Sequence, residues 1–199
     1  MRISRLILIS TLATSAPIAA LAHTGVDAGM HHGFVTGFMH PLTGLDHLAA
    51  MLAVGLWSAL VARRAWPDLL SAPAGFAAML LVGALAGLQG LEVPGVEPMI
   101  AASLLVMGLL VATRLQVPGP VAALLVGAFA AFHGLAHGYE LAGEPGAALT
   151  LAGMLSATVL LHGVGIGLGW AMRHAPRWTP QVTGGAVALL GLAMLTRLA

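Results

Sequence analysis

The sequence predicts an all-α integral membrane protein, a bundle of about six transmembrane helices that follows a cleaved signal peptide. Three observations predict this class. The 199-residue chain is 59% hydrophobic and only 8% charged, whereas soluble domains carry roughly a quarter charged residues. Its mean hydropathy is +0.96. Its apolar residues also form runs of the roughly 20 residues that a helix needs to cross a bilayer.

The first 22 residues have the pattern of a secretory signal peptide. Two arginines precede an apolar stretch over residues 6–20, and Ala20-Leu21-Ala22 matches an A-x-A cleavage site. We expect cleavage after Ala22, so that the mature chain begins at His23. The alternative is an uncleaved first transmembrane helix, but an apolar stretch of about 15 residues is short for a span.

Six apolar segments of spanning length follow the signal peptide. Proline or glycine marks most of the turns between them, as expected for residues that interrupt helices. We predict that residues 23–199 form a single six-helix transmembrane domain, with spans at about 42–61, 73–91, 98–115, 118–139, 146–172 and 180–198.

The distribution of arginine predicts the orientation of these spans. With the mature N-terminus outside the cell, the cytoplasmic loops receive most of the arginines, as the positive-inside rule requires; these are Arg63, Arg64, Arg114, Arg173 and Arg177. Arg197, near the C-terminus, is the exception. We therefore expect a multi-pass protein of the bacterial inner (cytoplasmic) membrane, with the mature N-terminus and the C-terminus both in the periplasm.

Composition also excludes several classes of function. The formal net charge is +1 and the chain has no lysine, so the clustered basic surface of a nucleic-acid-binding protein is absent. Because there is no cysteine, any metal site must use imidazole, carboxylate or backbone groups. The nine histidines are therefore the most informative residues.

Ionisable side chains inside spans are costly to insert and by default mark a functional pathway. One group is His40-Pro41-Leu42-Thr43-Gly44-Leu45-Asp46-His47, at the outer end of the first span. If this segment is helical from Pro41, His40 and His47 share one helix face. Asp46 is then either a further ligand or the hydrogen-bond partner that orients an imidazole.

The second group is Phe132-His133-Gly134-Leu135-Ala136-His137-Gly138-Tyr139-Glu140, near the outer end of the fourth span. Its two histidines are four residues apart, which places both imidazoles on one side of a helix within reach of one cation, and Glu140 continues this face. His162 stands alone near the middle of the fifth span, either as a hydrogen-bonding group or as part of an ion pathway.

Together these groups predict one nitrogen-rich metal site formed by the first and fourth spans, from His40, Asp46, His47, His133 and His137. Such ligands suit nickel, cobalt, zinc or copper and suit magnesium or calcium poorly. The alternative is a histidine-rich packing core without metal. A mature chain that begins at His23 also offers a free amine and an imidazole, which could capture a divalent metal at the entrance.

The two histidine-bearing segments, residues 40–47 and 132–140, resemble the signature motifs of the HupE/UreJ family of hydrogenase and urease accessory proteins. The resemblance implies a secondary permease for nickel, with cobalt as an alternative cargo, that supplies nickel enzymes through downstream metallochaperones or assembly proteins. It also implies that the functional positions are His40, Asp46, His47, His133, His137 and Glu140. No nucleotide-binding loop of the form G-x-x-x-x-G-K-[ST] is present, so transport would use a gradient or a partner.

Two other classes of function need similar ligands. An intramembrane zinc-dependent hydrolase would hold its metal with histidines and an aspartate, but the sequence assigns no partner to the candidate nucleophiles Ser103 and Ser156. A non-transporting membrane assembly factor would bind metal and hand it to a partner. The sequence alone hardly separates this assembly factor from a permease, because both need a binding site.

Overall fold

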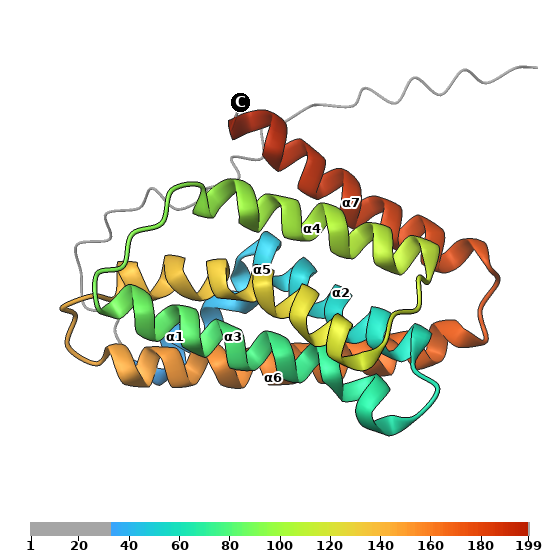
Figure 1. The fold of residues 1–199 in the computed structure, drawn as a ribbon, viewed down its shortest axis with the longest axis horizontal. Helices are drawn as coiled ribbons and strands as arrows, with labels where there is room; N and C mark the ends of the chain where they lie inside the picture. Colours follow the sequence, from blue (N-terminus) through green and yellow to red (C-terminus); the bar gives the residue numbers. More distant parts are fainter. Residues whose placement is uncertain (1–32, 199) are drawn as a thin grey trace, which may run out of the picture. The chain divides into compact units, whose positions relative to one another are not determined.

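The computed structural model describes residues 33–198, so the predicted signal peptide and His23 lie outside the described residues. The described part of the chain is helical (Figure 1). Its elements are α1 (Phe34–Thr43), α2 (Leu45–Val61), the π-helical turn η1 (Ala65–Leu69), α3 (Leu70–Leu88), α4 (Val96–Thr113), α5 (Gly119–Glu140), α6 (Ala147–Arg173) and α7 (Trp178–Leu198).

The predicted class, an all-α membrane protein with about six spanning helices, is confirmed. Within the described residues, five helical segments are long and apolar enough to cross a membrane: Pro67–Leu88, Val96–Thr113, Gly119–Glu140, Ala147–Arg173 and Trp178–Leu198. The bent pair formed by α1 and α2 adds a sixth if it is counted as one span.

The first span is broken at Gly44. α1 and α2 meet at 81°, because Gly44 has an extended backbone (φ −77°, ψ 112°) between the two helices. The expectation of a helix that starts at Pro41 is wrong, since α1 begins at Phe34 and contains Pro41 near its C-terminal end. His40 and His47 therefore lie on two helices and not on one face of a single helix.

Gly44 is needed at this break for space. A Cβ atom at this position would lie 3.2 Å from Oδ1 of Asp46 and 3.3 Å from Nδ1 of His47, which is tighter than ordinary van der Waals contact. The φ value of Gly44 is accessible to any residue, so conformational freedom does not explain the glycine. The break leaves room for the two polar side chains that follow it.

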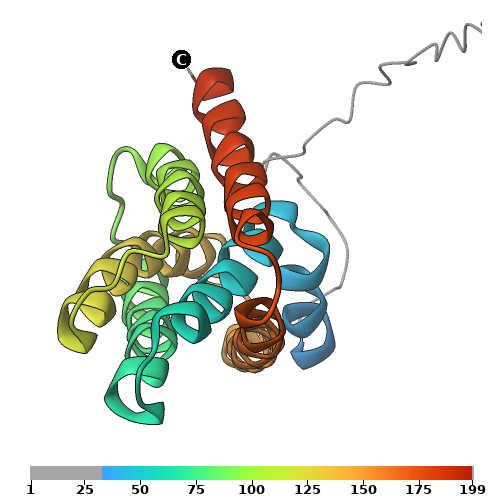
Figure 2. The ribbon, with the colours of Figure 1, turned by 90° about the vertical axis from the view of Figure 1, so that its right-hand side faces the viewer.

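Glycines bring the main helix pairs into backbone contact: α3 with α5, α4 with α7, and α2 with α6 (Figures 1 and 2). A Cβ atom at Gly134 of α5 would overlap the carbonyl of Leu80, and one at Gly55 of α2 would overlap the carbonyl of His162. Such close approaches of small residues are typical of helix packing in membranes. By contrast, Gly163 and Gly167 of α6 face open space.

Helix α2 occupies the interior of the bundle. Almost all of its residues from Ala50 to Ala59 are buried, and it contacts α3, α4, α6 and α7 as well as α1. A helix that is apolar on all sides belongs inside a bundle. One end of α2 carries His47 and the other carries Ser58, so α2 connects two polar regions through the core.

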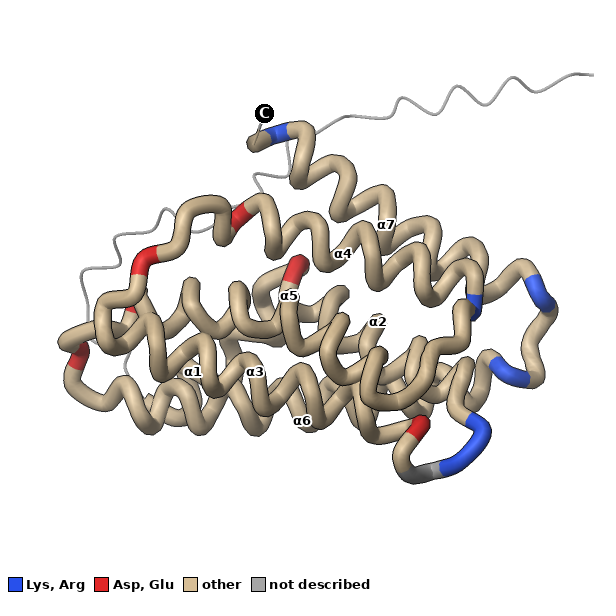
Figure 3. Tube along the Cα trace, viewed as in Figure 1, with Lys and Arg blue, Asp and Glu red and all other residues tan. Residues whose placement is uncertain are grey.

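The two ends of the bundle differ in charge (Figure 3). We call one the arginine end, which is defined by the connections that carry Arg63, Arg64, Arg114, Arg173 and Arg177. The opposite end is the acidic end, where Glu92 lies between α3 and α4 and Glu144 lies between α5 and α6. Because α7 starts at the arginine end, Arg197 lies at the opposite one.

Candidate metal centre

Three histidines from three helices converge inside the bundle. His40 comes from α1, His47 from α2 and His137 from α5, and one ring nitrogen from each lies within 4.8 Å of the other two. The ring centroids are 5.4 Å apart for His40 and His47, 4.8 Å for His40 and His137, and 4.7 Å for His47 and His137. His47 and His137 are buried, so the group lies largely out of contact with solvent.

Asp46 sets the orientation and tautomer of His47. Its Oδ1 lies 3.0 Å from Nδ1 of His47, and a carboxylate can only accept a hydrogen bond. Nδ1 of His47 therefore carries a proton, and Nε2 of the neutral ring presents a lone pair. Histidines that bind metals usually have their far nitrogen held by a carboxylate in this way, which fixes the orientation of the ring.

His137 of α5 also has a carboxylate nearby. Its Nδ1 lies 3.5 Å from Oε2 of Glu140, while its Nε2 lies 2.7 Å from Nε2 of His47. Two nitrogens held at about 2.0–2.1 Å from one metal and at a right angle to each other would be roughly 2.9 Å apart. The two Nε2 atoms are thus spaced to share one ion. Because Nε2 of the neutral His47 ring presents a lone pair, Nε2 of His137 must donate its proton across this contact until an ion replaces that proton.

His133 lies beside this group, one turn before His137 on α5. Its ring centroid is 5.2 Å from that of His47, but it is not among the three histidines whose nitrogens converge. Nε2 of His133 lies 3.0 Å from Oγ of Ser103 on α4. The hydroxyl of Ser103 lies 2.6 Å from the carbonyl of Ile100.

These two distances fix the tautomer of His133. Ser103 has one hydroxyl proton, which it donates to the carbonyl of Ile100, since a carbonyl can only accept. Nε2 of His133 must therefore donate to Ser103, which leaves the lone pair of a neutral ring on Nδ1. That Nδ1 is buried and has no hydrogen-bond partner among the described residues, so it is available to a ligand.

The sequence names Ser103 only as a candidate nucleophile and assigns it no partner. The contact with His133 supplies that partner. It does not create an activated nucleophile, because the serine proton points to a backbone carbonyl and not to the imidazole. Ser156 is exposed and donates to the carbonyl of Ala152 in its own helix, so it lies on the outside of the bundle.

His162 is separated from the other histidines by Phe76. The Phe76 ring on α3 lies 5.8 Å from the ring of His133 and 5.1 Å from that of His162. His162 is 4% exposed, and its Nε2 has no hydrogen-bond partner in the described part of the chain. With a rise of about 1.5 Å per residue, it lies roughly 22 Å along α6 from Ala147. His162 is therefore a deep imidazole set apart from the other histidines.

The structure thus sorts the predicted site residues into groups. The imidazoles of His40, His47 and His137 converge, and the carboxylates of Asp46 and Glu140 lie next to two of them. His133 lies alongside this group and His162 lies deeper. His23 lies outside the described residues. An imidazole-rich set of this kind can hold a late first-row divalent cation such as nickel, cobalt, copper or zinc.

Comparisons with known proteins agree on one family. A model of the family described as "HupE / UreJ protein" matches residues 11–194. Protein HupE of Rhizobium leguminosarum bv. viciae is 43% identical over 190 residues, which cover 94% of this chain and 95% of that protein. No solved structure is a significant match.

Proposed function

Because this chain belongs to the HupE/UreJ family, we propose that it is a secondary permease for nickel, with cobalt as the alternative cargo. The family implies a hydrogenase or urease accessory role in nickel or cobalt transport. The observation that carries the proposal is the convergence of His40, His47 and His137 inside a bundle of membrane-spanning helices. Ionisable groups at such depth are expensive, and they mark ion pathways by default.

The ligand type supports nickel or cobalt over the lighter divalent ions. Imidazole nitrogens suit nickel, copper, zinc and iron, while magnesium and calcium prefer oxygen. The site holds three convergent nitrogens, and its carboxylates approach the far nitrogens of His47 and His137. Magnesium, the abundant competitor in cells, would meet few oxygen ligands there.

The charge at the two ends supports an orientation. Arginine-rich connections remain in the cytoplasm, so the arginine end faces the cytoplasm and the acidic end faces the periplasm. Glu140 is 43% exposed at the end of α5, and His137 lies one turn further in. A cation that arrives from the periplasm would meet Glu140 first and then the three imidazoles.

Transport would proceed in steps along this line of groups. The incoming ion loses part of its hydration shell and binds the lone pairs of His40, His47 and His137. It displaces the proton that joins the two Nε2 atoms, so metal entry releases a proton. It then passes inward through the neighbourhood of His133 and His162. The sequence has no nucleotide-binding loop, and a gradient of metal or protons would drive the transfer.

Nickel transport should depend on pH in the direction that proton competition requires. A histidine binds metal only through an unprotonated nitrogen, and the reference pKa of imidazole is about 6.5. Affinity should therefore fall as the pH is lowered, because protons compete with the metal for the imidazole lone pairs. Nickel uptake measured at fixed free nickel between about pH 5 and 8 checks this. Uptake that does not change over the range would contradict binding by neutral imidazoles.

Reconstitution tests the permease assignment without any partner protein. Liposomes that contain the purified protein and a trapped nickel-sensitive dye should show nickel entry above that of empty liposomes. Nickel binding without entry would instead favour an assembly factor that hands metal to a partner. Hydrolysis of lipid or amide substrates by the zinc-loaded protein, with no entry, would favour the hydrolase.

Ser103→Ala should weaken nickel binding while the protein stays folded. Ser103 holds the tautomer that leaves Nδ1 of His133 able to bind the ion, and loss of a hydrogen bond that orients a metal-binding histidine typically costs about 10- to 100-fold in metal affinity. Calorimetry of the purified protein measures this loss. Ser156→Ala is the matched control, because Ser156 bonds only within its own helix among the described residues. Equal affinities in the two variants would show that Ser103 has no positioning role.

A further inference from the structure

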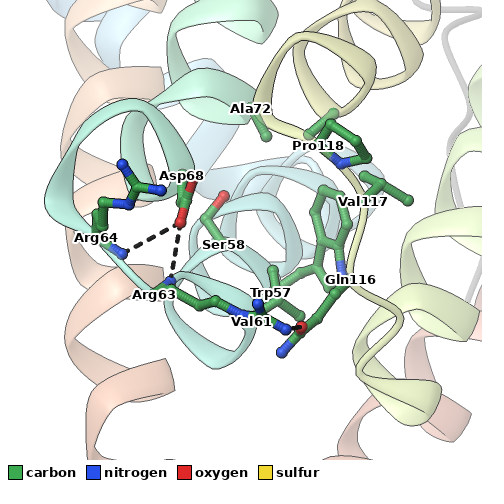
Figure 4. Close-up of a pocket in the computed structure, with 11 residues that line it drawn as sticks. Trp57, Ser58, Val61, Arg63, Arg64, Asp68, Ala72, Gln116, Val117 and Pro118 are labelled. Atoms are coloured by element: carbon green, nitrogen blue, oxygen red, sulfur yellow. Dashed lines mark hydrogen bonds between the residues drawn. The ribbon is translucent and has the colours of Figure 1, made fainter.

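A cavity of about 370 Å³ opens at the arginine end of the bundle (Figure 4). Its walls come from the end of α2, from η1 and the start of α3, and from the connection between α4 and α5. Exposed Arg63 and Arg64 lie at its rim, and the buried side chains of Trp57 and Ser58 form its deep part. It lies at the opposite end of α2 from His47.

Among the lining residues, the groups with lone pairs for a cation are oxygens, on Ser58, Asp68 and Gln116, while Arg63 and Arg64 bring guanidinium nitrogens that only donate. Ser58 is 1% exposed, and its Oγ has no hydrogen-bond partner within the described residues. Oδ2 of Asp68 accepts hydrogen bonds from the backbone N–H groups of Arg63 and Arg64, both at 3.2 Å. A buried hydroxyl without a partner is unfavourable unless water or a ligand in the cavity satisfies it. Ser58 therefore indicates that the cavity is hydrated or occupied.

The helix faces that carry the histidines continue into this cavity. On α2, the residues His47, Met51, Val54 and Ser58 follow one another at spacings of four, three and four residues. This spacing keeps all four on one face of the helix. On α5, the same kind of spacing leads from His137 through His133, Ala130 and Val126 to Ala122, which lines the cavity. The cavity and the metal centre thus lie along the same two helix faces.

An apolar plug separates the two regions. Met51, Val54, Phe76 and Val126 are at most 2% exposed and belong to one packed cluster. Phe76 touches the rings of both His133 and His162. Ala72, one turn before Phe76 on α3, lines the cavity. Phe76 is thus one helical turn from a residue of the cavity wall and in contact with both inner histidines.

We infer that this cavity is the cytoplasmic release vestibule of the permease, and that the plug around Phe76 closes it off from the metal centre. The inference rests on the proposed function. Oxygen ligands hold nickel less well than imidazoles do, so an ion that passes the plug enters a weaker site. Arg63 and Arg64 at the rim further disfavour retention of a cation. Both effects favour release into the cytoplasm.

Cysteine labelling tests the vestibule directly, because the chain contains no cysteine of its own. Ala122→Cys places a thiol on the cavity wall, and Val117→Cys places a second one there in case the first variant does not fold. Leu124→Cys is the matched control, since Leu124 lies two residues further on α5 and its side chain is 75% exposed on the outside of the bundle. The reagent is a charged, membrane-impermeant methanethiosulfonate.

We expect the cavity thiols to react in inside-out vesicles and to stay unmodified in right-side-out vesicles, with Leu124→Cys unmodified in both. Flux of radioactive nickel across the same inside-out vesicles should be lost when Ala122→Cys is modified and return when a reductant removes the adduct. Absence of labelling from the cytoplasmic face, or labelling from the outside, would overturn the vestibule.

The flux and labelling results also separate two kinds of failure. Cavity thiols that react while nickel flux continues unchanged would overturn the release role and assign the cavity to another ligand, such as an anionic lipid headgroup at the arginines. If the parent protein carries no nickel flux at all, the proposed function fails, and the release role fails with it. Labelling does not need transport, so it would still report whether the cavity opens to the cytoplasm.

Discussion

His47→Ala is expected to abolish measurable nickel binding by the purified protein. His47 is the histidine on which the others converge: its ring lies within 5.4 Å of the rings of His40, His133 and His137. It also shares the 2.7 Å contact between Nε2 atoms. Loss of a group that only hydrogen-bonds to a metal-binding histidine costs about 10- to 100-fold in metal affinity, and loss of the histidine itself should cost more.

Two further variants keep this experiment interpretable. His47→Ala leaves the carboxylate of Asp46 without its imidazole partner, which destabilises the protein. His47→Gln retains a hydrogen-bond donor for Asp46 and removes the imidazole. His174→Ala removes an exposed histidine at the end of α6 and should bind nickel like the parent. Parent-like affinity in a folded His47→Gln protein would show that the nickel site lies elsewhere.

Gly134→Ala is expected to lower both the stability of the bundle and its affinity for nickel. A methyl group at this position would overlap the backbone carbonyl of Leu80 on α3, which cannot rotate away as a flexible side chain can. Overpacking of this kind typically costs about 1–3 kcal/mol. Because α5 must shift outward to relieve it, the neighbouring His133 and the more distant His137 move with the helix.

Gly163→Ala is the control for this variant. A Cβ atom at Gly163 meets nothing within 4 Å, so the substitution should leave the stability unchanged or raise it by up to about 1 kcal/mol. Thermal unfolding in detergent measures the difference between the two variants. An equal unfolding temperature for Gly134→Ala and Gly163→Ala would contradict the close α3–α5 contact.

Local sequence patterns carried the prediction of the class and part of the site. Long apolar runs predict spanning helices whatever their neighbours are. The four-residue spacing of His133 and His137 places both on one side of α5, a purely local property of a helix. The arginines fall at one end of the bundle because alternate connections of a serial bundle lie on the same side.

Other features depend on backbone geometry and on contacts between distant residues. The break at Gly44 was missed because glycine is common inside the helices of this chain, and its sequence signal does not distinguish a bend from a close helix contact. Ser103 and His133 are 30 residues apart, and no spacing rule links them. From the sequence, Phe76 is predicted only to be an apolar core residue. Its contacts with His133 and His162 form only because α3, α5 and α6 pack together.

Accumulation of radioactive nickel tests the central claim most directly. The host should lack its own nickel uptake, and it should express the parent chain or the variants His47→Ala and His133→Ala, each shown to insert into the membrane equally. The account predicts nickel accumulation with the parent and none above background with either variant. Equal accumulation by the parent and the variants, or none with a correctly inserted parent, would contradict it.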